Sequence, residues 1–260
     1  MRARPPLLEI DGLNVHLGTP RKRILKDVGL ALRAGETLGL VGESGSGKST
    51  LAKTLVGVHR PSSGSVRFGG RDCLLATGKE RARLRREIQY VPQDPYSSLD
   101  PRRTIGETIA EALDPRHPRV PTYRQRIVEL LGLVRIDGSA LDRYPRQFSG
   151  GQRQRIAIAR ALAVEPSLII ADEITSALDL STQAEVLSLL ADLKRSMGLT
   201  LVFVSHDLAV VRSISDSLLV LLHGEVVEYG DAHEVFEAPA SDYTRTLIAS
   251  APGAPGFSLD

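Results

Sequence analysis

The chain has 260 residues, with 33 Lys and Arg, 31 Asp and Glu, and one cysteine. This length is enough for a full hydrophobic core and short for two independent domains, so we expect one domain with an inserted lobe. The formal net charge of +2 gives no strong basic field to attract nucleic acid or a lipid surface, and Cys73 alone excludes an internal disulfide and any multi-cysteine metal site.

Short β-rich runs fill the first part of the chain. They cover residues 7–15, 24–32 and 36–42, and turn residues separate them, which predicts antiparallel strands. A helix is expected from Lys48 to about Val58. Two further strands, within residues 64–70 and 87–93, should enclose a basic helical stretch.

Neither a membrane-spanning helix nor a cleaved secretory signal is expected. The longest apolar runs are far shorter than the roughly 20 residues of a membrane-spanning helix. The basic start, MRARPPLLEIDG, has no sustained apolar segment behind it, as a cleaved secretory signal would.

The pattern changes between Thr104 and Tyr144, where apolar residues recur at helical spacing and prolines separate the helical segments. We expect an inserted helical lobe here. Its clearest apolar positions are Ile127, Leu130, Leu131 and Val134.

Helices and strands alternate after this lobe. A helix is expected within residues 151–163, a strand within 167–173, then a long helix, and a strand within 199–206. Such alternation predicts a mostly parallel sheet covered by helices. One short helix and a disordered tail should end the chain. The apolar stripe of the long helix comprises Val186, Leu190, Leu193 and Met197.

The stretch GESGSGKST has the pattern of a phosphate-binding loop and stands between an apolar strand and a helix. Gly45 and Gly47 let successive N–H groups converge on a phosphate at a helix N-terminus. Lys48 should reach the β- and γ-phosphates, and Ser49 should bind Mg²⁺. The loop comprises Gly42, Glu43, Ser44, Gly45, Ser46, Gly47, Lys48, Ser49 and Thr50.

An acidic pair ends the apolar strand SLIIADE. Asp172 would hold Mg²⁺ through its water shell, and Glu173 would orient or deprotonate the attacking water. By itself, such a pair is more often a helix N-cap than a catalytic site. Together with the phosphate-binding loop, the catalytic interpretation is favoured.

A second glycine pair occurs in FSGGQ, at the start of an expected helix. Ser149, Gly150 and Gly151 offer a hydroxyl, two unobstructed N–H groups and a helix N-terminus, which suit an anion delivered from outside. The alternative is an ordinary serine-capped helix.

Together these motifs resemble the nucleotide-binding subunits of ABC transporters over nearly the whole chain. The resemblance identifies Gly42–Thr50 as Walker A, LIIADE as Walker B, FSGGQ as the signature, and SALD, with Asp179, as the D-loop. Gln93 matches the Q-loop glutamine and His206 the switch histidine. It implies an α/β P-loop NTPase (RecA-like) core, an N-terminal antiparallel β subdomain and an inserted helical subdomain.

The resemblance also implies boundaries and a dimer. The ATP-binding core with the β subdomain would cover residues 1–92 and 156–235, the helical subdomain 93–155, and a short extension 236–260. Two subunits close head to tail, so that the signature of one covers the ATP held by the other. The residues that would contact ATP are those of the loop and Gln93, Ser149, Gly150, Gly151, Gln152, Asp179 and His206. The Mg²⁺ site would comprise Ser49, Gln93 and Asp172. The catalytic residues would be Lys48, Gln93, Glu173 and His206.

The stretch YVPQDPYSSLDPR resembles the oligopeptide, dipeptide and nickel importers of this family. The terminal YTRTLIASAP resembles their H-P-Y-T-x-x-L segment, with Ser241 and Asp242 in place of His and Pro. The resemblance implies an ATPase subunit at the cytoplasmic face of the inner membrane, paired with a like or unlike second subunit. It would drive solute uptake through separate membrane subunits fed by an extracytoplasmic binding protein.

Two departures and two rival functions accompany this interpretation. His16 and Leu17 stand where the family places an aromatic residue against adenine. Ile174 replaces a usual proline, which could loosen the turn that aims Glu173. A subunit of a soluble complex such as carbon–phosphorus lyase is the alternative function. A DNA-repair or ribosome factor fits poorly, since the chain has no long coiled-coil insertion or tandem cassette.

Overall fold

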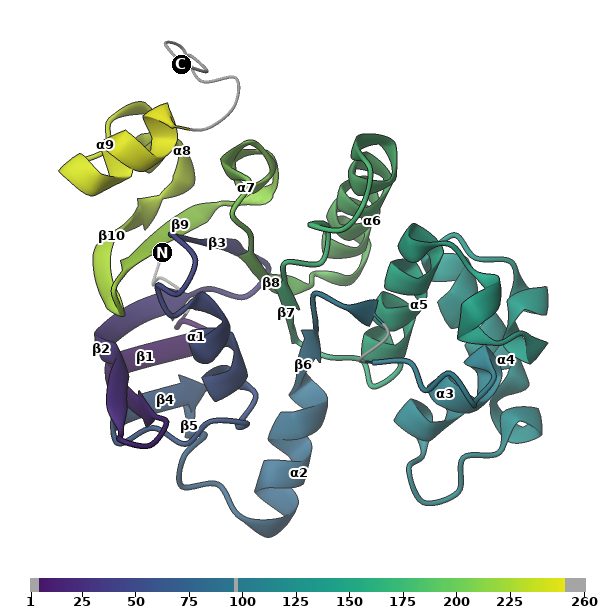
Figure 1. Cartoon of the computed structure of the whole chain (residues 1–260). Helices are drawn as coiled ribbons and strands as arrows, with labels where there is room; N and C mark the ends of the chain where they lie inside the picture. The colour runs from purple at the N-terminus through teal and green to yellow at the C-terminus, as the bar shows by residue number, and fades with distance from the viewer. Residues whose placement is uncertain (1–4, 96–97, 251–260) are drawn as a thin grey trace. The chain divides into compact units, whose positions relative to one another are not determined.

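The computed structural model describes residues 5–95 and 98–250 and divides into two compact units, one drawn from Met1–Arg85 and Thr200–Asp260, the other from Arg86–Leu199 (Figure 1). Tyr96 and Ser97 of the importer-like stretch lie outside the described residues. So do residues 1–4 and 251–260, which include the predicted tail. The predicted subdomain boundaries stay a prediction.

The first unit contains an antiparallel sheet in the order β2-β1-β4-β5. Burial alternates along β2, where Val28, Leu30 and Leu32 are buried and the residues between them are exposed. This alternation is typical of a sheet with one covered face. The strands are β1 (Leu8–Leu17), β2 (Lys22–Leu32), β4 (Ser63–Phe68) and β5 (Arg71–Asp72).

A second set of strands in this unit surrounds β3 (Thr37–Val41), which pairs in parallel with β8 (Thr200–Val204) and β9 (Ser217–Leu222). β10 (Glu225–Asp231) pairs antiparallel with β9. The expectation that residues 36–42 continue the antiparallel set is wrong. All five residues of β3 are buried, and a strand covered on both faces belongs in a parallel, helix-covered sheet.

Among the described residues, five helices belong wholly or mainly to the first unit. α1 begins at Lys48, as predicted, and ends at Leu55, three residues early, shortly before Gly57 with φ 76°. The basic stretch forms α2, in which only Leu84 is buried, so its charged side chains face solvent. The helices are α1 (Lys48–Leu55), α2 (Gly78–Glu87), α7 (Leu208–Ile214), α8 (Ala232–Glu237) and α9 (Asp242–Ala249).

The second unit pairs β6 (Ile88–Val91) in parallel with β7 (Leu168–Asp172). Its helical lobe, teal in Figure 1, confirms the predicted insertion, and the four apolar positions expected there are buried. A capping box between Thr104 and Glu107 begins α3. The helices are α3 (Ile105–Leu113), α4 (Val120–Leu133), α5 (Gly150–Leu162) and α6 (Leu180–Met197), with short 3-10 turns η2 (Gly138–Asp142) and η3 (Pro145–Gln147).

The long helix α6 corrects one residue of the predicted stripe. Val186, Leu190 and Leu193 are buried as expected, but Met197 is 40% exposed and Leu189 takes its place at 1%. Met197 is the last helical residue before Gly198, whose φ of 64° turns the chain away. In the described parts of the chain, no helix combines the length and apolar composition needed to cross a membrane.

This correction predicts different costs for two truncations on α6. Leu189→Ala removes a buried side chain and should lower the free energy of unfolding by about 2–5 kcal/mol. Met197→Ala, at an exposed helix end, should change it by less than about 1 kcal/mol. Urea denaturation of both variants measures the difference, and equal losses would contradict the observed burial.

Candidate functional site

The glycine-rich loop connects β3 to α1 in the first unit and lies directly against other backbone. Gly42 has φ 144° and Gly47 φ 112°, which L-residues rarely adopt. A Cβ at Gly42 would lie 2.1 Å from the Leu221 carbonyl oxygen, and one at Gly47 would lie 2.8 Å from Leu25 Cδ2. Both positions therefore require glycine.

Hydrogen bonds fix the curl of the loop around Lys48, which is 6% exposed. The Lys48 ammonium donates to the carbonyl oxygens of Gly42 at 2.7 Å and Glu43 at 2.8 Å. The Ser46 N–H donates to Glu43 O at 3.2 Å, and Ser46 O accepts from Gly224 N at 2.9 Å. A buried cation thus lies within a closed backbone turn.

The loop residues fit a bound phosphate. In the part of the chain that the structure describes, the buried Ser46 hydroxyl has no hydrogen-bond partner, although buried polar atoms normally have one. A buried ammonium and an unsatisfied hydroxyl in one glycine-rich turn suit an anion.

His206 lies at the same edge of the sheet as the loop. Leu40 and Val204 are register partners in the parallel pair β3 and β8, and Ser205 N donates to Leu40 O at 3.4 Å. The exposed His206 therefore follows one strand where the loop follows its neighbour. Asp207 then caps α7, accepting from the N–H groups of Ala209 and Val210.

The predicted Walker B aspartate ends β7 in the second unit and is 4% exposed. The Tyr90 hydroxyl, from β6, donates to Asp172 Oδ2 at 2.8 Å. Burial, together with this carboxylate, raises the pKa of Tyr90 well above its usual value. The phenol therefore stays protonated at neutral pH and can keep donating to Asp172.

Glu173 follows with φ 50°, a left-handed backbone that is strained for a non-glycine residue and typical of functional turns. The Ser176 hydroxyl donates to Glu173 O at 2.9 Å, and Gln93 Nε2 donates to that hydroxyl at 3.1 Å. Ile174 is 2% exposed, so its buried side chain anchors the turn that a proline ring would otherwise stiffen.

The signature residues begin α5. Ser149 is the N-cap, its Oγ accepting from Gln152 N at 3.3 Å, while Gln152 Oε1 accepts from Ser149 N at 2.9 Å. The helix-cap alternative is therefore realised, and it leaves Ser149 and Gly150 exposed. Gly151 is buried, and a Cβ there would lie 2.1 Å from Thr182 Cγ2.

Asp179 caps α6 and binds the same threonine. Its carboxylate accepts from Ser181 Oγ at 2.6 Å, Thr182 N at 2.9 Å and Thr182 Oγ1 at 2.8 Å. The Ser181 hydroxyl and then the Thr182 groups hold the pKa of Asp179 well below its usual range. Thr182 thus places its hydroxyl on the D-loop aspartate and its methyl against the signature glycine.

This contact predicts the effect of Gly151→Ala. The methyl would overlap Thr182 Cγ2, and overpacking of about 1–3 kcal/mol outweighs a helix-propensity gain of at most about 1 kcal/mol. The melting temperature should fall. Gly150→Ala is the control, because its Cβ would lie 3.6 Å from Leu178 Cδ2, an ordinary contact.

Adding Thr182→Ser should rescue the Gly151→Ala variant, because serine lacks the clashing methyl and keeps the hydroxyl on Asp179. A double variant no more stable than Gly151→Ala would show that this contact is not the cause.

His16 and Leu17, the candidates for adenine contact, are both half-buried in β1. His16 Nδ1 lies 2.8 Å from Ser62 Oγ, which donates its proton to Asn14 O at 3.0 Å. His16 Nδ1 is therefore the donor to Ser62, which fixes the plane of the ring. Which of the two residues contacts adenine stays open at this position.

Besides Ser181 and Thr182, other residues near the motifs carry hydroxyl groups that were not among the predicted site residues. Tyr90 contacts Asp172, Ser176 contacts Gln93, and Tyr243 accepts from Glu43 N at 3.2 Å. A tyrosine within a buried strand signals that its hydroxyl needs a partner. The sequence does not say which partner, because Glu43 and Tyr243 are 200 residues apart.

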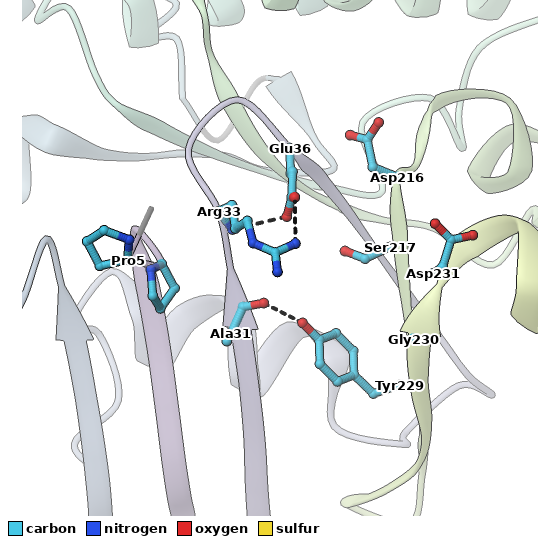
Figure 2. A pocket seen from close by; sticks show the side chains of 10 residues that line it. Pro5, Ala31, Arg33, Glu36, Asp216, Ser217, Tyr229, Gly230 and Asp231 are labelled. Carbon is cyan, nitrogen blue, oxygen red and sulfur yellow. Dashed lines mark hydrogen bonds and ion pairs between the residues drawn. The ribbon is translucent and has the colours of Figure 1, made fainter. Parts of the chain in front are cut away.

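A cavity of about 560 Å³ lies in the first unit. Figure 2 shows the side chains that line it. Arg33 and Glu36 pair across its wall, and Asp216 Oδ2 accepts from Thr37 N at 2.6 Å. Glu36 and Asp216 precede β3 and β9, so the cavity lies at the amino edge of these parallel strands. Ligands of such sheets bind at the carboxyl edge, where the glycine-rich loop lies.

A model of the family described as ABC transporter matches residues 25–176, more than half of the chain. The chain belongs to the ABC transporter family. The match includes the glycine-rich loop, the signature and the Walker B strand, and ends at Ser176, before Asp179 and His206.

Curated relatives extend the similarity over almost the whole chain. The oligopeptide transport ATP-binding protein OppF of Salmonella typhimurium is 46% identical, over 96% of this chain and 78% of its own length. OppF of Bacillus subtilis is 45% identical, over 95% of this chain and 82% of its own.

Solved structures agree with this family membership. CbiO1 of Clostridium perfringens, part of an ABC transporter complex, has a TM-score of 0.81 at 27% identity, covering 95% of each chain. The ATP-binding cassette MJ0796, solved as a dimer bound to ADP and Pi, has a TM-score of 0.77 at 31% identity, over 86% of this chain and 98% of that one. The fold is therefore that of an ABC ATP-binding cassette.

Proposed function

We propose that this chain is the ATPase subunit of an ABC importer and drives the uptake of oligopeptides, dipeptides or a related solute. The observation that carries the proposal is the 46% identity to an oligopeptide transport ATP-binding protein over 96% of the chain. A phosphate-binding loop closed around a buried lysine supports ATP as the substrate.

The loop residues would bind the phosphates of ATP, with backbone N–H groups and the α1 N-terminus facing the anion. Lys48 would exchange its carbonyl partners for phosphate oxygens. The resemblance assigns Ser49, Gln93 and Asp172 to Mg²⁺. Bound Mg²⁺ neutralises phosphate charge during transfer. Tyr90 would keep the Asp172 carboxylate in one orientation.

Glu173 would orient or deprotonate the attacking water. Its left-handed backbone and the Ser176 hydroxyl fix the direction of the residue, and Gln93 is joined to this turn through Ser176. We assign His206 to the terminal phosphate, because it follows the strand beside the loop.

A second ATPase subunit would complete each site. The exposed Ser149 and Gly150 at the start of α5 are available to cap the terminal phosphate of ATP held by the partner. Asp179 would lie at the dimer seam and reach the signature through Thr182. A dimeric cassette structure at 31% identity supports this pairing.

Permease subunits are the other partners of such a subunit, which is peripheral to the membrane. We place it at the cytoplasmic face of the inner membrane, with an extracytoplasmic solute-binding protein acting indirectly and no nucleic acid involved.

Replacing the proposed base separates binding from hydrolysis. Glu173→Gln should retain ATP binding and dimerise with ATP, while its hydrolysis rate falls at least about 100-fold. Glu185→Gln, on the exposed face of α6 and 3.7 Å from Arg155, is the matched control and should hydrolyse ATP normally. Phosphate release and size-exclusion chromatography measure both properties. Unchanged turnover in Glu173→Gln would refute the assigned role.

Partner identity tests the transport function. The tagged native chain, purified from detergent-solubilised membranes, should bring down membrane permease subunits and lose them after a high-detergent wash. Labelled di- and tripeptide uptake should fall in cells that express only Lys48→Ala. Recovery in a soluble enzyme complex instead, with uptake intact, would overturn the importer proposal.

A further inference from the structure

The C-terminal helix α9 reaches the phosphate-binding loop through a tyrosine. The N–H of Glu43, the second loop residue, donates to the Tyr243 hydroxyl oxygen at 3.2 Å. Tyr243 lies outside residues 25–176, which match the family model. We propose that Tyr243 is a positioning residue of the ATP site that holds the start of the loop in its phosphate-binding shape. This inference rests on the proposed function of the loop.

The sheet places α9 beside the end of β3. Glu228 of β10 is the register partner of Val220, and Val220 is the partner of Val41, the last residue of β3. The loop leaves the sheet directly after Val41. Glu228 therefore lies at the level of Val41 across the sheet, and a segment bonded to Glu228 is fixed close to the start of the loop.

Glu228 provides that anchor. Its carboxylate accepts from the N–H groups of Ala240 at 2.7 Å and Ser241 at 3.1 Å, immediately before α9. Burial opposes ionisation, but the hydrogen bonds donated to this carboxylate outweigh it and lower the pKa of Glu228. Thr244, which follows Tyr243 in α9, is fully buried. The helix is thus tied at its start, and the Tyr243 hydroxyl has a defined position.

Glu43 is held on both sides of its Cα atom. Its carbonyl oxygen accepts from Lys48 Nζ and from Ser46 N, while its N–H has the Tyr243 hydroxyl. Loss of the hydroxyl would release one of these two peptide groups. The Glu43 N–H shares a peptide group with the Gly42 carbonyl, which accepts from Lys48. Rotation of this peptide group would turn that carbonyl away from the Lys48 ammonium, so the affinity for nucleotide should fall.

The test is Tyr243→Phe in the full chain, which keeps the ring and removes the hydroxyl. One neutral hydrogen bond corresponds to a modest change, so the Kd for mant-ATP and the KM for ATP should rise about two- to fivefold. The kcat should stay near the wild-type value, because the groups that act on the water are untouched. If Tyr243 had only a structural role, Tyr243→Phe would lower the melting temperature but would not raise the KM while leaving the kcat unchanged.

Tyr229→Phe is the matched control. The Tyr229 hydroxyl donates to the Ala31 carbonyl at the cavity of Figure 2, on the opposite edge of the sheet from the loop. It should leave the Kd for mant-ATP unchanged. Glu228→Ala should raise this Kd as Tyr243→Phe does, and the two changes combined should raise it no further, since both act through one contact.

Lys48→Ala separates failure of the inference from failure of the proposed function. If Lys48→Ala binds mant-ATP like the wild type, the loop is not the ATP site and both ideas fail. If Lys48→Ala loses binding while Tyr243→Phe matches Tyr229→Phe in Kd and KM, the positioning role of Tyr243 alone is refuted.

Discussion

The candidate site depends on close backbone contact around the glycine-rich loop. Gly42 lies against the Leu221 carbonyl, where a Cβ would come within 2.1 Å. Ser46 accepts from the N–H of Gly224, which has no room for a side chain against Ile24 O, 2.0 Å from an ideal Cβ. Gly224 in turn accepts from Lys26 N at 2.8 Å. The turn between β9 and β10 therefore lies between the loop and β2, and it holds the Ser46 carbonyl of the loop.

The second unit uses hydroxyl groups for a similar purpose. Tyr90 holds Asp172, Ser176 joins Gln93 to the backbone of Glu173, and Thr182 connects Asp179 to Gly151. Each of these hydroxyls contacts a residue with a proposed role in ATP hydrolysis or dimer closure. The helix-cap and functional interpretations of Ser149 and Asp179 are compatible, because a capped N-terminus still offers exposed groups to a partner.

The sequence predicts local features well, since they depend on neighbouring residues. α1 begins at Lys48 because the loop must end in a helix N-terminus, and the apolar spacing identifies the buried face of α4. Three-dimensional partners were harder to predict. The sheet membership of β3 depends on what covers its second face, and Leu189 replaces Met197 because the helix ends at Gly198. The contacts of Tyr90 and Tyr243 join residues 82 and 200 positions apart, which no local pattern encodes.

The position of Gly224 has a consequence for synthesis. The loop leaves the ribosome early, but the turn on which it rests is translated about 175 residues later, roughly 10–35 s at ordinary elongation rates. A nascent chain therefore carries an unsupported glycine-rich segment for most of its translation. Nucleotide bound at the proposed loop site cannot assist the folding of the early chain, because the turn that supports the loop emerges only with the last quarter of the polypeptide.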